Sequence, residues 1–298
     1  GRGSAQGRQS GCAIGTVPEG RTGADWLDAL ISERRPGSLL LDVRSERIPK
    51  QVRSWREGGI LVATIDDPSE RRRESDLAFY PPVPQVYEHD WDSYTGGLHV
   101  DWEWVVLRRD FASAEPPSGH NPPRLLVTMG GSDPAGLTLL ALRELDQLNE
   151  SFETVVVLGP GFIHGAELDA FLAEAKRSYR IEIKVHDMAA LMRQADLALA
   201  SFGVTAYELA AVGVPAIYLC LTADHARSAS KFVEDGIALS CGQYQECRPG
   251  LLAATVRSLL HEPAQRCEMG VLARRLIDGL GATRIAATLV DRSLARHV

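Results

Sequence analysis

Residues 197–208 read LALASFGVTAYE, and this stretch decides the fold class. Leu197–Ala200 is a short apolar run typical of a buried strand, Ser201 to Gly203 form a turn of small residues around one phenylalanine, and Val204–Val212 has the composition of a helix. A buried strand followed at once by a helix is half of a βαβ unit, so we expect a parallel sheet.

The same alternation continues on both sides of this stretch. We predict further strands at 124–129, 154–158, 181–185, 216–221 and 237–240, and helices at 135–148, 166–178, 188–194 and 225–235. Two or three more helices follow residue 249. Strands and helices that alternate at short spacing predict a doubly wound α/β fold.

The chain divides into four parts by composition. Residues 1–23 are Gly-rich and predicted to be a loop or disordered, and 24–112 carry a weaker βαβ pattern of a Rossmann-like domain. That pattern has helices at 24–34 and 48–57 and strands at 38–43, 60–65 and 76–80. Residues 113–123 contain four prolines and are predicted to be a linker, and 124–298 form the second Rossmann-like domain.

Composition excludes several classes of protein. The net charge is −7 and the residues on either side of position 120 are both acidic in balance, so a nucleic-acid partner is not expected. No run approaches the ~20 apolar residues of a membrane span. Five cysteines without a CxxC pair predict no disulfide framework and no metal site, and we expect a cytoplasmic protein without a cofactor, a monomer or a weak dimer.

The first candidate site is the turn Gly130-Gly131-Ser132-Asp133, between a predicted strand and a predicted helix. Two glycines let the backbone approach a ligand, and a helix N-terminus offers unpaired N–H groups to an anion. The alternative is an ordinary turn in which Ser132 or Asp133 caps the helix.

The second candidate site is the turn that opens the helix at Val204. Ser201, Gly203 and Thr205 can present N–H and hydroxyl groups to a diphosphate, and the Glu208 carboxylate, one turn further on, can accept two sugar hydroxyls. The alternative is a capping box, with Thr205 as the N-cap and Glu208 three residues later.

Other candidates are weaker. His225 follows the predicted strand 216–221, where open parallel sheets bind ligands, although a surface histidine is the commoner case, and Asp224 beside it is interpreted as an N-cap. Asp67 ends the predicted strand 60–65, and acidic residues there also cap turns. The run 71–73 of three arginines is interpreted as a solvated helix end.

Taken in order, these motifs resemble nucleotide-sugar enzymes of the GT-B fold. The matching segments are 65–67, the LRRDF segment at 107–111, 130–134, 201–209 and Gly213-Val214-Pro215, and the resemblance extends over about residues 38–240. The nearest likeness is to the UDP-sugar hydrolases of pseudaminic acid biosynthesis and their spore-coat polysaccharide relatives. The transferase that makes lipid II is a more distant likeness.

The resemblance implies roles for particular residues. The helix at Val204 would hold the diphosphate of a UDP-sugar, Glu208 the ribose hydroxyls and the backbone around Met188 the uracil, while Gly130 to Asp133 would face the sugar phosphate. The family's reaction needs no metal: water attacks the nucleotide sugar and UDP leaves.

One departure leaves two functions open. The family carries a GxGH turn with a catalytic histidine, whereas no histidine of this chain precedes His89. We therefore expect an incomplete N-terminal domain. The chain is either a UDP-sugar hydrolase or transferase whose base is a different residue, with His225 and Asp67 the first candidates, or a catalytically inactive nucleotide-sugar-binding or partner protein.

Overall fold

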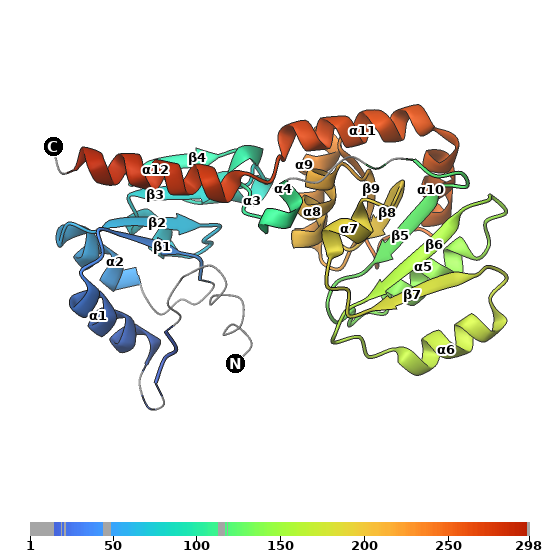
Figure 1. Cartoon of the computed structure of the whole chain (residues 1–298), viewed down its shortest axis with the longest axis horizontal. Helices are drawn as coiled ribbons and strands as arrows, with labels where there is room; N and C mark the ends of the chain where they lie inside the picture. The colour runs from blue at the N-terminus through green and yellow to red at the C-terminus, as the bar shows by residue number, and fades with distance from the viewer. Residues whose placement is uncertain are drawn as a thin grey trace. The chain divides into compact units, whose positions relative to one another are not determined.

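A computed structural model describes residues 15–18, 20, 22–43, 49–112, 117 and 119–296. Contacts divide the chain into two compact units, of residues 1–78, 91–98 and 289–298 and of residues 79–90 and 99–288. Two sheets are present in the described part of the chain, one of four strands and one of six (Figure 1). The predicted linker at 113–123 falls within the second unit as the contacts divide the chain, and residues 113–116 and 118 lie outside the described part.

The six-stranded sheet of the second unit has the order β10-β9-β8-β5-β6-β7. All of its neighbouring strands pair in parallel, which confirms the arrangement predicted for the strands between residues 124 and 221. Its strands are β5 (Arg124–Thr128), β6 (Glu153–Leu158), β7 (Tyr179–Ile183), β8 (Leu197–Ala200), β9 (Ala216–Cys220) and β10 (Ala238–Gln243).

Helices cover both faces of this sheet (Figure 1). They are α5 (Leu137–Leu145), α6 (Gly165–Glu174), α7 (Met188–Met192), α8 (Val204–Val212), α9 (Ala223–Glu234), α10 (Leu251–His261) and α11 (Pro263–Leu276). The last helix, α12 (Gly281–Ala295), does not cover this sheet, and its residues from Leu289 onward belong to the first unit. Alternate residues of one strand enter opposite cores: Ala198 and Ala200 pack with Phe202 and Phe232, while Leu197 and Leu199 pack on the other face. Burial on both faces explains the continuous apolar runs of the sequence.

The four-stranded sheet has the order β1-β2-β3-β4. Its strands are β1 (Ser38–Leu41), β2 (Leu61–Ile65), β3 (Leu77–Tyr80) and β4 (Gly97–Val100), and β1 pairs with β2 in parallel. The helices α1 (Gly23–Arg34) and α2 (Pro49–Glu57) belong to the first unit, where Ile31, Val52 and Trp55 pack with Leu41 and Val62.

Residues 66–75 correct one expectation. Arg71 and Arg72, predicted to lie at a solvated helix end, are only 1% and 2% exposed, within the 3-10 helix η1 (Glu70–Glu74). The Arg71 guanidinium donates to the Asp67 carboxylate and to the Val43 carbonyl, each over 2.5 Å. These hydrogen-bond partners, which the folded chain brings to Arg71, compensate the cost of burying its charge.

Residues 81–112 contain short elements that the sequence pattern does not predict. They are α3 (Pro84–Glu88), β4, the 3-10 helix η2 (Trp102–Trp104) and α4 (Arg109–Ala112). Phe111 is buried and packs in the core that contains Phe202 and Leu209, so α4 is anchored within the second unit.

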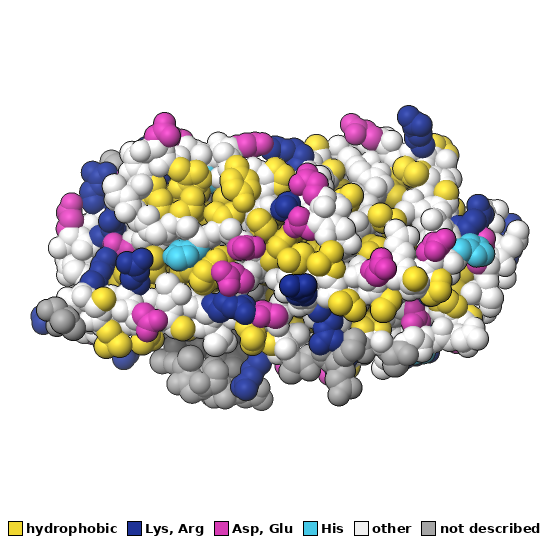
Figure 2. All heavy atoms as spheres, turned by 90° about the horizontal axis from the view of Figure 1, so that it is seen from above, with side chains coloured by type: hydrophobic (Ala, Val, Ile, Leu, Met, Phe, Trp, Pro, Cys, Tyr) yellow, Lys and Arg dark blue, Asp and Glu magenta, His cyan; other side chains and the backbone are white. Residues whose placement is uncertain are grey.

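None of the helices in the described part of the chain is long and apolar enough to cross a membrane. On the face shown in Figure 2, Lys and Arg side chains are interspersed with Asp and Glu side chains. That face therefore carries no extended basic area of the kind that nucleic acids bind.

Candidate functional site

The strand order places a topological switch point between β5 and β8. From β5 the chain continues to β6 and β7 on one side, and then returns to β8 on the other side. Thr128 and Ala200 pair at the carboxyl ends of the two strands. In open parallel sheets, ligands bind in the crevice outside the carboxyl ends at such a point. Both glycine-containing turns predicted from the sequence start there.

These two turns lie against each other. The Ser201 N–H donates to the Thr128 carbonyl over 3.1 Å. A Cβ built on Gly130 would lie 3.5 Å from the Ser201 hydroxyl oxygen, and Gly130 has a φ of +85°, a conformation that favours glycine. Gly130, Gly131 and Ser132 are exposed, so the structure brings the first predicted turn and Ser201 together at one open surface.

The N-terminus of α8 at this surface is open. Gly203 is its N-cap and no side chain caps the helix, and its first turn holds no acidic residue. Among the described residues, nothing accepts a hydrogen bond from the N–H groups of Val204 and Thr205, which have no partner within the helix either. A Cβ on Gly203 would meet no atom within 4 Å. This end of α8 therefore presents unpaired donors and the positive end of a helix dipole to solvent.

The capping box considered for Thr205 and Glu208 does not form. The helix begins at Val204 with Gly203 as its N-cap, so Thr205 lies inside the first turn. The Glu208 side chain is 11% exposed, and its Oε1 accepts a hydrogen bond from Nη2 of Arg108 at 3.2 Å. Sequence inspection noted Arg108 only as part of the LRRDF segment. Its pairing with Glu208, one hundred residues away, is a feature of the folded chain.

Asp133 acts as a helix cap, as one reading of its turn predicted. Its carboxylate is buried and accepts from the N–H of Leu137 at 2.7 Å and from that of Thr138 at 2.9 Å. The Asp133 carbonyl is hydrogen-bonded to Nε2 of His164 at 3.1 Å. Both carboxylate oxygens of Asp133 are therefore engaged at the start of α5, unlike the exposed residues 130–132 of the same turn.

The turn after β6 fixes the position of Gly131. The Gly161 N–H donates to the Gly131 carbonyl over 2.8 Å. A Cβ on Gly159 would lie 2.3 Å from the Gly131 carbonyl oxygen, so only glycine allows this approach. Sequence inspection missed both Gly159 and His164. The Gly-Pro-Gly run at 159–161 is the signal that could have pointed to this turn.

Met188 and His225 belong to the helices that follow β7 and β9. Met188 starts α7 and packs partly buried against the core that holds Phe202. His225 lies in the first turn of α9, with its ring centroid 6.3 Å from that of Phe202. Its Nδ1 is buried and has no hydrogen-bond partner among the described residues.

The N-cap of α9 differs from the prediction. The hydroxyl of Thr222 accepts from the His225 N–H at 3.1 Å, whereas the Asp224 carboxylate accepts from Nε2 of Gln85 at 2.8 Å. The prediction that Asp224 is the N-cap of α9 is therefore wrong, because Thr222 occupies that position. Threonine fits the position equally well, because its hydroxyl offers the same acceptor.

Asp67 belongs to the first unit, and its carboxylate has several partners. It is 1% exposed and accepts from Arg71, from the Ser69 N–H at 2.9 Å and from the Ser69 hydroxyl at 2.7 Å. The Arg71 guanidinium and the two donors of Ser69 hold this carboxylate in place within the first unit. The geometry supports a structural role for Asp67.

Comparison with known proteins agrees with this architecture. Residues 125–275, more than half of the chain, match the model of the glycosyltransferase family 28 C-terminal domain. The spore coat polysaccharide biosynthesis protein SpsG of Bacillus subtilis is 30% identical over 169 residues, which are 56% of this chain and 50% of that protein. A second relative, from Acidithiobacillus ferrooxidans, is the UDP-N-acetylglucosamine--N-acetylmuramyl-(pentapeptide) pyrophosphoryl-undecaprenol N-acetylglucosamine transferase. It is 30% identical over a region that covers 57% of this chain and 48% of the transferase. The chain thus spans about half the length of the curated relatives it matches.

Solved structures show the same fold at low sequence identity. MurG of Acinetobacter baumannii superposes with a TM-score of 0.63 at 17% identity, over 88% of this chain and 76% of that one. A glycosyltransferase of Rickettsia africae superposes with a TM-score of 0.67 at 12% identity, over 97% of this chain and 87% of the Rickettsia chain. These likenesses confirm the predicted GT-B-like α/β fold with parallel sheets. The chain is glycosyltransferase-like and belongs to the family defined by the glycosyltransferase family 28 C-terminal domain.

Proposed function

We propose that this chain binds a UDP-sugar or a related nucleotide sugar, and that it serves as a hydrolase or glycosyltransferase-like protein in surface polysaccharide or nonulosonic acid biosynthesis. One observation carries the proposal: the open N-terminus of α8 lies at the switch point of the sheet, with the Glu208 carboxylate one turn behind it. Uncapped N–H groups attract the diphosphate, and a carboxylate suits the ribose hydroxyls.

The diphosphate would lie between the two glycine-containing turns. The unpaired N–H groups of Val204 and Thr205 would face it on one side, and the exposed Gly130 and Gly131 would leave room for its sugar on the other. No carboxylate in the first turn of α8 repels the phosphates. The positive end of the helix dipole adds to this attraction.

Arg108 has two roles in the proposed complex. It compensates the charge of the nearly buried Glu208 and holds this carboxylate in position. Only Oε1 of Glu208 is bonded to Arg108, so Oε2 remains for a ribose hydroxyl. Because the Arg108 side chain is 52% exposed, its guanidinium can also reach a phosphate oxygen of the ligand.

The names of related proteins support this class of ligand. The name of the Acidithiobacillus ferrooxidans enzyme contains UDP-N-acetylglucosamine, and the spinosyn rhamnosyltransferase SpnG, at 16% identity and a TM-score of 0.57, was solved with thymidine diphosphate. The backbone around Met188, at the start of α7, would meet the base of the nucleotide.

Hydrolysis would need a base that accepts a proton from the attacking water as UDP leaves. His225 is the better of the two candidates, because its Nδ1 has no partner in the described chain while the Asp67 carboxylate is bound by Arg71 and Ser69. The second candidate function is nucleotide-sugar binding without turnover. The engagement of Asp67 and Asp133 within the fold favours it, since neither carboxylate is left for proton transfer.

Glu208→Ala tests the binding role. We expect UDP affinity to fall by about 30-fold to 1,000-fold, since the ribose loses charge-assisted hydrogen bonds of about 2–4 kcal/mol in total. Glu174→Ala, at an exposed position of α6, is the control and should bind UDP as the parent does. Isothermal titration gives both affinities. A lower melting temperature with unchanged UDP affinity would show that Glu208 is only structural.

His225→Ala then separates the two functions. If the parent chain releases UDP from a UDP-sugar, the variant should lose about 10²-fold to 10⁴-fold of that rate while binding UDP with parental affinity. If the parent binds UDP but releases none from any UDP-sugar supplied, the binding function is supported in place of the hydrolase.

A further inference from the structure

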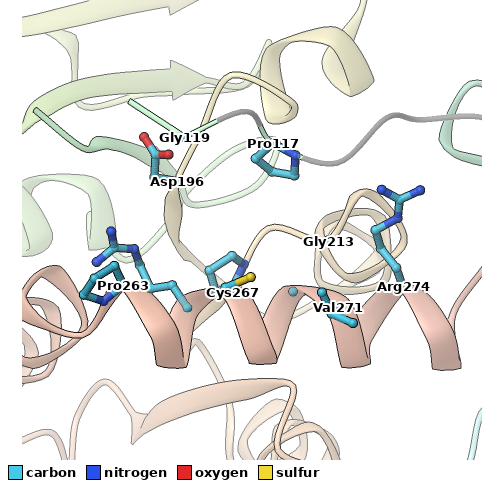
Figure 3. Close-up of a pocket in the computed structure, with 11 residues that line it drawn as sticks. Pro117, Gly119, Asp196, Gly213, Pro263, Cys267, Val271 and Arg274 are labelled. Atoms are coloured by element: carbon cyan, nitrogen blue, oxygen red, sulfur yellow. The ribbon is translucent and has the colours of Figure 1, made fainter. Parts of the chain in front are cut away.

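A second concavity lies at the opposite edge of the six-stranded sheet, within the second unit (Figure 3). It has a volume of about 490 Å³ and lies between α11 and the segments that precede β8 and β9. Asp196 and Pro215 come directly before those strands, whereas Ser201 and Thr222 follow them. The concavity is thus at the amino ends of the strands and separate from the proposed nucleotide site.

The walls of this concavity are mainly apolar and rigidly built. The apolar contribution comes from Val271, three prolines and the backbones of three glycines (Pro117, Pro215, Pro263, Gly119, Gly213 and Gly270). A Cβ on Gly270 would lie 2.3 Å from the Gly213 carbonyl oxygen, so α11 packs backbone to backbone against the turn after α8. Close backbone packing fixes the shape of the wall, and the volume lies in the range of small-molecule sites.

Arg274 lies at one end of the concavity (Figure 3). Its aliphatic stem covers Gly213, where an added Cβ would lie 2.5 Å from Arg274 Cδ. In the part of the chain that the structure describes, no carboxylate or carbonyl accepts a hydrogen bond from its guanidinium. Arg274 is half-buried as a residue and lies beside these apolar walls, and a carboxylate or phosphate would satisfy its guanidinium in a bidentate manner.

The other charged groups of the concavity are already engaged. The Arg266 guanidinium donates to the carbonyls of Leu259 and Leu260 at the end of α10. The Asp196 carboxylate accepts from the N–H and Nδ1 of His120 and from the N–H of Arg124. Asp196 would repel an anion, and Figure 3 shows it away from Arg274. Among the charged side chains that the structure describes in this lining, Arg274 is therefore the one left to recognise a ligand.

We infer that this concavity binds a small amphipathic anion, with its apolar body against Pro215, Pro263 and Val271 and its carboxylate or phosphate head group on Arg274. This site is independent of the proposed function, because it shares no residue with the α8 site. Octanoate and octyl phosphate are suitable probes, since they combine similar short alkyl chains with different anionic head groups, and octanol provides a similar chain without charge.

Binding of these probes to the full chain tests the inference. We expect octanoate or octyl phosphate to bind at least tenfold more tightly than octanol. Arg274→Gln, which keeps the stem over Gly213, should abolish that difference, whereas Arg275→Gln, the next residue of α11 and exposed, should retain it. The inference would be overturned if octanol bound as tightly as both anions. It would also be overturned if Arg274→Gln, with a parental melting temperature, bound the anions as the parent does.

Cys267 reports the location of the bound probe. It is exposed and lines the concavity, whereas burial raises the pKa of Cys220 to about 11 and that of Cys241 to about 12, so these two thiols remain protonated and unreactive. The bound anion should slow the modification of Cys267 by N-ethylmaleimide, measured by peptide mass spectrometry, and leave the rate at Cys247, outside the concavity, unchanged. Binding without protection of Cys267 would place the probe elsewhere and overturn the assignment.

Discussion

A Cβ on Gly159 would lie 2.3 Å from the Gly131 carbonyl oxygen and 2.5 Å from that of Gly130. Gly159→Ala must therefore displace the glycine turn after β5, and we expect it to lower the free energy of unfolding by about 1–3 kcal/mol. Gly165→Ala is the matched control, because a Cβ there meets nothing within 4 Å at the start of α6. The control should be neutral or stabilising by about 0.4–1 kcal/mol. Urea unfolding compares the two, and equal effects would contradict the role given to Gly159.

Asp133 allows a sharper separation of capping from ligand binding. Asp133→Ala removes both acceptors of the Leu137 and Thr138 N–H groups and should cost about 1–2 kcal/mol of unfolding free energy. Asp133→Asn keeps one acceptor oxygen and should cost less. In both variants the affinity for UDP, measured at a temperature where the protein is folded, should be close to that of the parent. A large loss of affinity in Asp133→Asn without a loss of stability would instead show that the carboxylate contacts the ligand.

Short turns between helices depend on a few charged pairs. Between α11 and α12, Nη1 of Arg284 donates to Oδ1 of Asp278 over 2.8 Å, and the Leu280 N–H donates to the same carboxylate over 2.9 Å. The hydrogen bonds from Arg284 lower the pKa of Asp278 below its ordinary value. A carboxyl whose pKa is lowered in the folded state stabilises it above the unfolded pKa of about 3.9, and this stabilisation is lost as the pH falls through the folded value.

Asp278→Asn should therefore destabilise the fold in a pH-dependent manner. About a third of each side chain is exposed, so solvent screening limits the effect to about 0.5–1 kcal/mol at pH 7. Denaturant unfolding at pH 7 and at successively lower pH should show the difference from the parent shrink below about pH 4. A difference that stays constant with pH would mean that the Asp278 charge contributes nothing.

Ligand binding acts on the stability of the complete chain. A nucleotide that binds only the folded state raises the melting temperature. At a nucleotide concentration of one hundred times Kd, the free energy of unfolding increases by about 2.7 kcal/mol. We expect UDP to raise it more than CDP, GDP or dTDP at equal concentration in a thermal-shift series. Glu208→Ala should lose this increase. An equal response to all four diphosphates would indicate recognition of the diphosphate without recognition of the base.

The apolar periodicity of the chain was sufficient to predict the six-stranded sheet and most of the helices that cover it. α8 spans Val204–Val212 as predicted, and β8 pairs in parallel with β5 and with β9. These strands could be predicted because a strand buried on both faces leaves a clear apolar run in the sequence. β7 begins two residues earlier than predicted. It is an edge strand whose residues are half-exposed, so its apolar pattern is weak.

The roles of individual polar groups could not be predicted in the same way. Thr205 and Asp224 both fit the capping patterns, but Gly203 and Thr222 occupy the N-cap positions, since several residues near a helix start can satisfy the same donors. Within 130–133, the sequence does not separate the exposed glycines from the buried cap at Asp133. Only the packing of the β6 turn against this segment does so.

Contacts between segments that are distant in the sequence could not be predicted either. Arg108 and Glu208 are one hundred residues apart, and the burial of Arg71 depends on Asp67 and on the carbonyl of Val43. Strand and helix formation follows from residues within a few positions of one another, so the sequence pattern records it. A pairing of charges or the wall of a concavity requires two surfaces to meet after the helices and strands have packed, and no local pattern encodes which side chains then face each other.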